Sequence, residues 1–340
     1  MRNGPRALVV AAMVTAAALA VVGPVLLGHD PARPAVTSGA LAGPPPAAPT
    51  TTAPSTRAAP GTTATTAAKA TTAAKATTTT AAKRPAAARP RRPGPGTVQY
   101  FTMPSGDADG HRREFWVYRP GIPDSAELPV VYFLHGYPGD EHSVADSGVA
   151  PALERLFASG VPPFVVVAPN GESSPRHDTE WTDSADGRVR IEHWIVNFLV
   201  PAVEGTHRRD RGHRAVVGFS MGGFGAMNLG LKHPDLFGQI VSIAGYFRVD
   251  DPDGMGGDDP GWEAANSPDQ HVAAGAATRM LLVTAAGEHD PLIAGEAQRF
   301  RGLAEAAGQH PAVVTAPGPH TFDLVLAQMP AVARFLAGGW

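Results

Sequence analysis

The stretch Gly218–Gly223, GFSMGG, follows the apolar run RAVV and leads into FGAMNLGLKHP. A serine between two glycines, where a strand turns into a helix, has two interpretations. In the first, Ser220 is the N-cap of the helix, a position that serine favours. In the second, a sharp turn strains the backbone of Ser220, and glycines at 218 and 222 remove side chains that would collide with it. The second interpretation leaves the hydroxyl exposed as a nucleophile.

Around this turn, short apolar runs alternate with amphipathic stretches, which is typical of βαβ units and a largely parallel sheet. The two earliest runs have no helix between them and predict an antiparallel edge. Eight strands in this arrangement predict a mostly parallel sheet flanked by helices, as in the α/β-hydrolase fold, with ligands at the carboxyl ends of the strands. The predicted strands are Val98–Thr102, Glu114–Tyr118, Val130–Leu134, Phe164–Ala168, Ala215–Val217, Gln239–Ile243, Met280–Thr284 and Ala312–Thr315, and the predicted helices are Val149–Ala158, Ile191–Arg208, Met221–Lys232, Leu292–Ala307 and Phe322–Leu336.

A nucleophilic serine needs a base, because its free hydroxyl is a poor nucleophile near neutral pH. In this fold the chain order is serine, acid, histidine. Three histidines follow at a useful distance, namely His289, His310 and His320. His310 falls between a helix and a strand, at the wrong edge of the sheet, whereas His320 directly follows the last strand. We therefore predict His320 as the base.

The acid is expected after the strand Met280–Thr284, in AAGEHDPLIAGE. Asp290 precedes a proline and a predicted helix, so it also suits an N-cap, and a capping carboxylate can still orient a histidine. Glu288 is the alternative, two residues closer to the strand. We favour Asp290, because the shorter side chain on the turn fits the common layout.

The oxyanion formed during acyl transfer also needs hydrogen-bond donors. The strand Val130–Leu134 ends in HGYPG, which alone reads as a turn rich in glycine and proline. Opposite the serine turn, however, the Tyr137 N–H and the Met221 N–H can form an oxyanion hole, and each such donor stabilises the transition state by about 3 kcal/mol.

Composition divides the chain in two. Residues 1–96 contain no aromatic residue and hold 11 of the 28 Lys and Arg residues but one of the 31 acids, so residues 97–340 carry a net charge of −13. Only residues 97–340 can build a core, and we expect them to form one esterase-like domain. Its acidity argues against nucleic acid as a partner. The absence of cysteine excludes a thiol nucleophile and a Cys-ligated zinc site.

The N-terminal part predicts export. Residues 7–27 are uncharged and apolar and are long enough to cross a bilayer as a helix. We expect residues 1–28 to be an uncleaved membrane anchor or, alternatively, a cleaved signal peptide, with the domain outside the cytoplasm. Residues 29–96, rich in Ala, Thr and Pro, predict a disordered cationic linker suited to an anionic envelope polymer.

Two sequence features could suggest a metal site, but the spacing of their residues does not support one. Five aspartates lie between Asp250 and Asp259, but their spacing does not match an EF-hand loop. None of the thirteen histidines forms H-x-x-x-H or H-E-x-x-H on a helix. We therefore expect no metal and no cofactor.

Several motifs together resemble one family. VVYFLHGYPGDE, FVVVAPNG, IEHWIVNFLVPAVE, VVGFSMGGFGAMNLGLKHPDLF, GEHDP and PGPHTFD are similar, in this order, to the Putative esterase family of the α/β-hydrolase fold, over residues 98–337. The family includes feruloyl and other carbohydrate esterases, the esterase D group and the mycolyltransferases. The resemblance implies Ser220, Asp290 and His320 as a catalytic triad, with Tyr137 and Met221 as the oxyanion hole.

Two departures argue against mycolyl transfer, since mycolyltransferases use Glu as the acid and have Asp-Gly where this chain has His135-Gly136. The sequence thus predicts an exported serine esterase that forms an acyl-enzyme on Ser220 and acts on a small-molecule, glycan or lipid ester. The alternatives are an acyltransferase acting on envelope sugars and a non-catalytic, envelope-associated binding domain.

Overall fold

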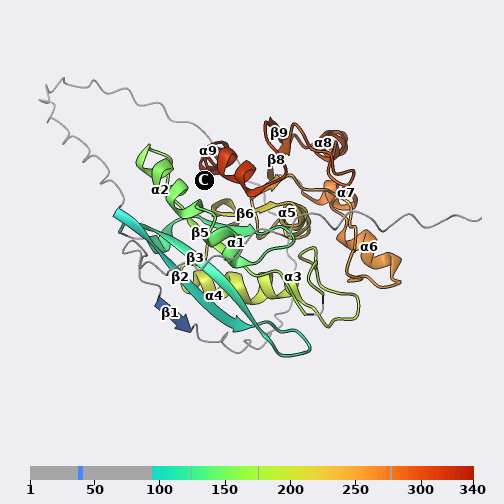
Figure 1. Cartoon of the computed structure of the whole chain (residues 1–340), viewed down its shortest axis with the longest axis horizontal. Helices are drawn as coiled ribbons and strands as arrows, with labels where there is room; N and C mark the ends of the chain where they lie inside the picture. The colour runs from blue at the N-terminus through green and yellow to red at the C-terminus, as the bar shows by residue number, and fades with distance from the viewer. Residues whose placement is uncertain (1–36, 41–93, 124, 175, 276–277) are drawn as a thin grey trace, which may run out of the picture. The chain divides into compact units, whose positions relative to one another are not determined.

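The computed structural model describes residues 37–40 and 94–340, apart from residues 124, 175 and 276–277. Their strands form one nine-stranded sheet in the order β1-β2-β3-β5-β4-β6-β7-β8-β9 (Figure 1). The six strands β4 to β9 run parallel, whereas β3 is antiparallel to both of its neighbours. The strands are β1 (Thr37–Ala40), β2 (Gly94–Pro104), β3 (Arg112–Gly121), β4 (Val130–Leu134), β5 (Val165–Pro169), β6 (Arg214–Phe219), β7 (Gln239–Ile243), β8 (Arg279–Ala285) and β9 (Ala312–Ala316).

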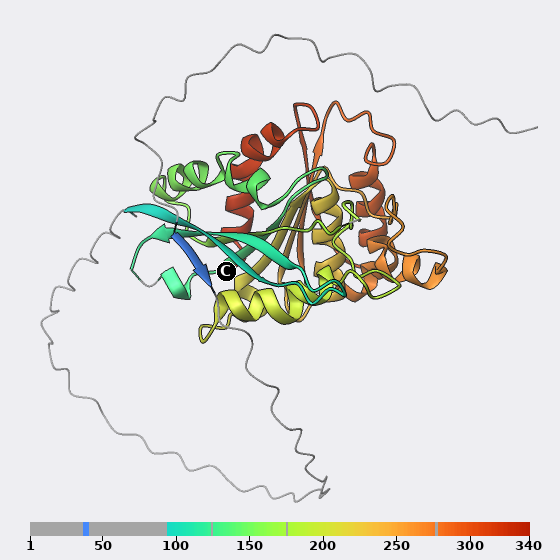
Figure 2. The same ribbon diagram turned by 60° about the horizontal axis from the view of Figure 1, so that its bottom comes forward.

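Helices cover both faces of the sheet, which explains why the central strands are continuous apolar runs rather than alternating ones. Successive residues of β4 pack into two separate cores: Tyr132 faces one, and Val131 and Phe133 face the other. The first core contains α3 to α5 and α8, and the second contains α1, α2 and α9 (Figure 2). The helices are α1 (Glu141–Ala145), α2 (Val149–Ala158), α3 (Ile191–Trp194), α4 (Val200–Glu204), α5 (Met221–Lys232), α6 (Pro260–Asn266), α7 (Pro268–His271), α8 (Glu296–Ala306) and α9 (Phe322–Ala337).

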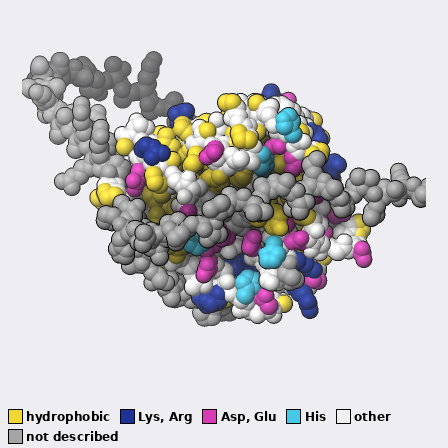
Figure 3. Space-filling view, in the orientation of Figure 1, with side chains coloured by type: hydrophobic (Ala, Val, Ile, Leu, Met, Phe, Trp, Pro, Cys, Tyr) yellow, Lys and Arg dark blue, Asp and Glu magenta, His cyan; other side chains and the backbone are white. Residues whose placement is uncertain are grey.

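Apolar side chains are gathered on part of one face of the molecule. Figure 3 shows most of them over the half that carries α9, interspersed with charged and histidine side chains, and more acidic and histidine side chains in the other half. Several half-buried residues on the side of the second core contribute apolar surface, among them Leu156, Leu326 and Phe335. The apolar side chains therefore extend from the core of this face to its surface.

All eight predicted strands and the α/β-hydrolase fold are confirmed. Two helices differ from the prediction. The first ends at Glu204 rather than Arg208 and contains a π-type segment at Ile195–Leu199, between α3 and α4. The second, α8, begins at Glu296 rather than Leu292, because Gly295 adopts a left-handed conformation with φ 83° and interrupts the helix.

The expected boundary between linker and domain also changes. β2 begins at Gly94, three residues before the predicted domain start, and β1 lies inside the predicted linker. β1 pairs in parallel with Gln99–Thr102 of β2, whose outer edge would otherwise leave backbone groups unpaired. The predicted anchor at 7–27 and the rest of the linker lie outside the described residues. Among the described helices, none is both long and apolar enough to cross a membrane.

A buried ion pair joins the end of α4 to the start of β6. Arg214 donates to both carboxylate oxygens of Glu204, over 2.7 and 2.8 Å, and both side chains are almost fully buried. The Tyr132 hydroxyl donates to the same carboxylate over 3.3 Å. Arg214 also donates to the carbonyls of Arg209 and Leu236, so the guanidinium organises the turn before the central strand.

Replacing Arg214 with methionine is expected to lower the free energy of unfolding by about 3–5 kcal/mol, because Glu204 remains buried without its partner. Arg208 offers a matched control, since its guanidinium lies 3.9 Å from the same carboxylate but is half exposed. Arg208→Ala is expected to cost less than about 1 kcal/mol. Urea denaturation measures both free energies of unfolding. Equal losses of free energy would show that the buried ion pair contributes no more to stability than the exposed one.

Candidate active site

Ser220 occupies a strained turn between β6 and α5. Its φ is 57° and its ψ is −121°, a region that non-glycine residues rarely adopt. The turn needs both glycines: a Cβ on Gly218 would lie 1.9 Å from the Gly222 carbonyl oxygen, and a Cβ on Gly222 would lie 2.1 Å from the Leu134 carbonyl oxygen. Ser220 occupies the N-cap position of α5, but its side chain makes no capping hydrogen bond and is free for another role.

His320 lies directly after β9 and meets the serine. Its Nε2 is 2.9 Å from the Ser220 Oγ, within hydrogen-bond distance. The ring lies against Phe219, with 4.9 Å between the ring centroids, and keeps about a quarter of its side chain exposed. The structure thus brings the predicted nucleophile and the predicted base together.

The acid beside His320 is Glu288, and the preference for Asp290 is corrected. Glu288 Oε2 lies 2.7 Å from His320 Nδ1. Asp290 is exposed, and its Oδ1 accepts the Leu292 N–H over 2.9 Å. The chain turns immediately after β8, so residue 288 faces the histidine, while Asp290 has already entered the next turn. The expected capping role of Asp290 is not observed either, because α8 begins at Glu296 after Gly295, and Asp290 closes only a local turn.

Backbone donors hold the Glu288 carboxylate in place. Its Oε1 accepts the N–H groups of His289 and Asp290, each over 3.0 Å. Partial burial raises the pKa of Glu288, but the Asp290 N–H and the pairing with His320 outweigh this effect, and the pKa is lowered below its ordinary value. The carboxylate is therefore ionised near neutral pH and can accept the Nδ1 proton of His320.

The HGY segment lies against the serine turn. A Cβ on Gly136 would be 3.0 Å from both the Ser220 Cβ and the Phe219 carbonyl oxygen, a contact tighter than most side chains make, so glycine favours this approach. Tyr137 follows, and Met221 is the first residue of α5, where backbone N–H groups have no partner within the helix. Both predicted oxyanion donors thus belong to segments that border Ser220, and their role remains a prediction. The Tyr137 ring is 49% exposed at this edge.

His135 is a site residue that the sequence reasoning missed. It is fully buried, its Nε2 accepts the Gly171 N–H over 2.9 Å, and its Nδ1 lies 2.9 Å from the Gly136 carbonyl oxygen. Since Nε2 accepts, the proton is on Nδ1 and is donated to Gly136. Burial lowers the pKa of His135 to about 4, which keeps the ring neutral. The only sequence signal was a histidine at the end of a buried strand.

A second layer supports His135. Trp181 is fully buried and donates from Nε1 to the His135 carbonyl over 3.2 Å, with its ring edge-on to the imidazole at 4.8 Å. Glu180 and Trp181 both have positive φ, at 49° and 60°. Trp181 contacts Gly171 and Gly225 so closely that neither position has space for a Cβ. This tryptophan is therefore part of the core packing.

The buried carboxyl of Glu180 ties the aspartate-rich loop to this layer. It accepts the Tyr246 hydroxyl over 3.0 Å and the N–H groups of Asp250 and Asp251 over 2.9 and 3.2 Å. In turn, Asp251 accepts N–H groups from Met255 and Gly256. The carboxylates of Glu180 and Asp251 thus fix the loop through its backbone N–H groups.

Stability is expected to fall as the pH rises from about 4.5 to about 8, because burial raises the pKa of Glu180 from 4.5 to about 8 despite hydrogen bonds that lower it. A group protonated more readily in the folded state contributes its full stability below its unfolded pKa and has lost that contribution once the pH passes its folded pKa. The melting temperature of Glu180→Gln is expected to change less between pH 6 and 9 than that of the wild type. Glu172→Gln, on the same loop, serves as the control, and identical profiles for wild type and Glu180→Gln would contradict the assignment.

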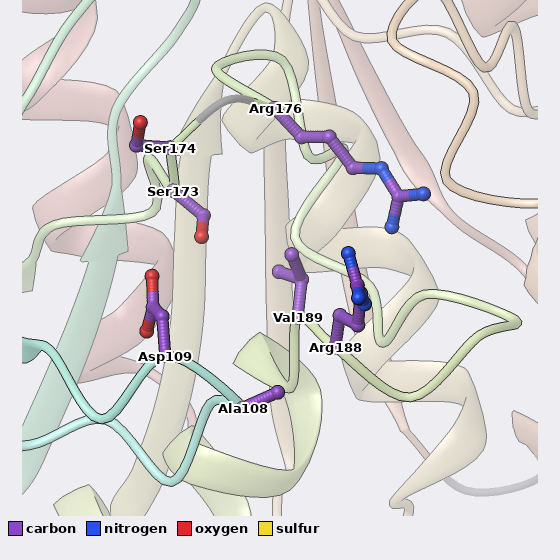
Figure 4. A pocket seen from close by; sticks show the side chains of 7 residues that line it. All are labelled: Ala108, Asp109, Ser173, Ser174, Arg176, Arg188 and Val189. Atoms are coloured by element: carbon purple, nitrogen blue, oxygen red, sulfur yellow. The ribbon is translucent and has the colours of Figure 1, made fainter.

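A separate pocket of about 390 Å³ lies beside the turn between β2 and β3 (Figure 4). Arg176 in this pocket is held by two hydrogen bonds to Asp186, of 2.9 and 3.0 Å. The lining contains none of Ser220, Glu288 and His320, so this pocket is separate from the cluster at Ser220. The lining residues are Ala108, Asp109, Ser173, Ser174, Arg176, Arg188 and Val189.

Comparisons with known proteins identify the family of this chain. Residues 107–312 match the family model described as Putative esterase. The chain is 32% identical over 178 residues to the Putative esterase NocK of Nocardia uniformis subsp. tsuyamanensis. This alignment covers 47% of this chain and 50% of NocK, so the match spans half the length of that relative. It is 28% identical over 299 residues to the diacylglycerol acyltransferase/mycolyltransferase Ag85B of Mycobacterium avium, covering 74% of this chain and 85% of that protein.

Solved structures share the fold. A ferulic acid esterase superposes with a TM-score of 0.63 at 21% identity and covers 72% of this chain and 99% of its own. An S-formylglutathione hydrolase from Agrobacterium tumefaciens superposes with a TM-score of 0.59 at 19% identity and covers 72% and 96%. At these identities the similarity extends to the arrangement of strands and helices.

Proposed function

The chain belongs to the esterase family whose model it matches, and from this premise we propose that it is a serine esterase that hydrolyses carboxylic esters through an acyl-enzyme on Ser220. One observation carries the proposal: the Ser220 hydroxyl, on a strained turn and free of any capping role, lies 2.9 Å from the His320 Nε2. A binding domain has no need of a strained serine paired with a histidine, and this argues against the non-catalytic alternative.

The reaction begins with proton transfer from Ser220 to His320 as the serine Oγ attacks the ester carbonyl carbon. Glu288 accepts the Nδ1 proton in a hydrogen bond, which fixes the tautomer and stabilises the imidazolium. His320 then gives its proton to the leaving alkoxide, and the acyl group stays on Ser220. In the second half, His320 activates water, which attacks the acyl-enzyme and releases the acid.

Negative charge develops on the carbonyl oxygen at each tetrahedral intermediate. The proposed donors are the Met221 N–H, at the start of α5, and the Tyr137 N–H, and each such donor is worth about 3 kcal/mol. His135 helps to aim the second donor. It holds the Gly136 carbonyl on one side of the Gly136–Tyr137 peptide, and in a trans peptide the N–H then points to the opposite side.

Acyl transfer to an alcohol is the second candidate. The similarity to Ag85B supports it. The acid supports it as well, because the residue beside His320 is Glu288, and a glutamate acid was one of the two features by which mycolyltransferases differed from the predicted triad. The other distinction, His135-Gly136 in place of Asp-Gly, remains. The same acyl-enzyme serves both reactions, and the acceptor decides between them.

The place of action is also part of the proposal. The apolar run 7–27 and the cationic segment that follows support export and contact with an anionic envelope. The mass of the mature protein distinguishes an anchor from a cleaved signal. A mass that corresponds to a chain starting near residue 39 or 43 would identify a cleaved signal.

A fluorophosphonate probe tests the esterase proposal. The full chain is expected to take up one probe molecule, on the peptide that contains Ser220. It is also expected to release the phenol from a panel of aryl esters in an initial burst, while the acid is released at the steady-state rate. Ser220→Ala is the control and is expected neither to label nor to turn over. A wild type that does neither would refute the proposal, and equal labelling of Ser220→Ala would move the nucleophile elsewhere. An acylated-alcohol product that replaces free acid when glycerol or a sugar is added would favour transfer.

A further inference from the structure

A second cluster of titratable side chains lies where α1 packs against β3 and β5. Glu141 and His142 are consecutive in α1, and Glu114 lies on β3. One potential ligand atom of each residue lies within 4.8 Å of the others. None of the three takes part in the proposed reaction.

Glu141 has a buried oxygen that the protein leaves unsatisfied. Its side chain is 1% exposed, and its Oε2 has no hydrogen-bond partner among the described residues. A buried carboxylate oxygen without a partner is costly and calls for an explanation such as a bound ion.

His142 is oriented toward the carboxylates. Its Nε2 lies 3.5 Å from the Glu141 Oε1, and its Nδ1 lies 3.7 Å from an oxygen of Asp146. The ring stacks on Tyr100 of β2, with 5.0 Å between centroids and 26° between planes. A carboxylate behind one ring nitrogen and an aromatic ring on its face are the kind of outer contacts that orient a metal-bound histidine.

We propose that Glu114, Glu141 and His142 bind a divalent transition-metal ion such as Zn²⁺ or Mn²⁺. Two carboxylates and an imidazole suit these ions, with water in the remaining positions. The spacing agrees: tetrahedral ligands about 2.1 Å from zinc lie about 3.4 Å apart, close to the separation of the His142 and Glu141 atoms. The ion would tie α1 to β3, four residues beyond Tyr137, and would thereby fix the segment that follows the oxyanion loop.

A neighbouring cluster provides the contrast. Asp107, Asp109 and His111 also lie close together, but Asp107 is already paired with Arg113 and accepts the Arg190 N–H over 2.7 Å. An arginine thus neutralises the buried carboxylate there. The two clusters have similar composition, and only the one at α1 has an unsatisfied buried oxygen.

Metal binding by the full chain, freed of any affinity tag and treated with chelator, tests the proposal. Equilibrium dialysis against ZnCl₂ or MnCl₂, with the metal counted by mass spectrometry, is expected to give one ion per chain. Glu141→Gln and His142→Ala are each expected to weaken binding by at least about tenfold, as loss of even an outer-shell contact does. Asp109→Asn, in the other cluster, is expected to bind as the wild type does. Less than one ion per chain, or equal binding by all variants, would overturn the proposal.

Melting temperatures separate loss of binding from loss of folding. The metal is expected to raise the melting temperature of the wild type and of Asp109→Asn, and to leave that of Glu141→Gln and His142→Ala unchanged. His142 is exposed, so its replacement tests the site with little risk to the core. If both site variants still gain stability from the metal, the ion binds elsewhere and the assignment fails. Because Ser220→Ala is expected to bind the metal normally, the result does not depend on the esterase proposal.

Discussion

Replacing Glu288 with glutamine is expected to lower kcat/KM for ester hydrolysis by about 10⁴-fold, as loss of the acid does in a Ser-His-Asp triad. The structure explains why an isosteric change is so damaging. The Glu288 Oε1 accepts two backbone N–H groups, so the glutamine oxygen stays there and its NH₂ group faces His320. Nδ1 must then accept, the proton moves to Nε2, and His320 can no longer take the serine proton.

Asp290→Asn is the matched control, because the two acids are two residues apart on the same turn. Its side chain contacts Leu292 rather than His320, and its backbone N–H still holds Glu288, so activity is expected to stay within a few-fold of the wild type. Initial rates on an aryl acetate measure both variants, with circular dichroism to confirm folding. The reverse order of effects would return the acid role to Asp290.

The sequence predicts those parts of the site that depend on a few neighbouring residues. The serine turn depends on residues 218 to 223, whose glycines have no space for a side chain, and this constraint is visible in the sequence as GFSMGG. His320 follows from chain order and from its place after the last strand. These two residues meet as predicted because parallel strands bring their carboxyl ends to one edge.

The acid could not be predicted in the same way. Glu288 and Asp290 share one turn, and the choice between them depends on the path of the backbone after β8, which side-chain length alone does not reveal. The edge strand β1 was missed for a related reason, since a segment rich in small residues pairs with β2 through its backbone and leaves no periodic signal. The start of α8 depends on a single left-handed glycine.

The cluster at α1 also has no sequence signature. Glu141 and His142 are adjacent, and Glu114 comes from another strand, so their spacing matches no metal-binding motif. Packing of α1 against β3 creates the cluster, and burial of one carboxylate distinguishes it from an ordinary charged surface. The sequence expectation of no metal rested on local spacing, which cannot detect such a site.

His135→Phe is expected to lower kcat by about 10²–10³-fold, the loss that follows removal of one oxyanion donor. Phenylalanine keeps an aromatic ring against Trp181 but removes the Nδ1 donor to the Gly136 carbonyl and the acceptor for the Gly171 N–H. The Gly136–Tyr137 peptide is then free to rotate, and its N–H no longer points steadily at the developing oxyanion. Because this interaction strengthens in the transition state, KM is expected to change much less than kcat.

Trp181→Phe separates this positioning role from simple packing. It removes the indole hydrogen bond to the His135 carbonyl and some buried surface, but it leaves both imidazole hydrogen bonds in place. We expect a loss of stability, seen in the melting temperature, with a kcat within about tenfold of the wild type, because the oxyanion donors keep their orientation. A burst of acylation measured at saturating substrate isolates the chemical step from deacylation. If His135→Phe raises KM without lowering kcat, or if the two variants lose kcat equally, His135 acts through packing and the donor at Tyr137 does not depend on it.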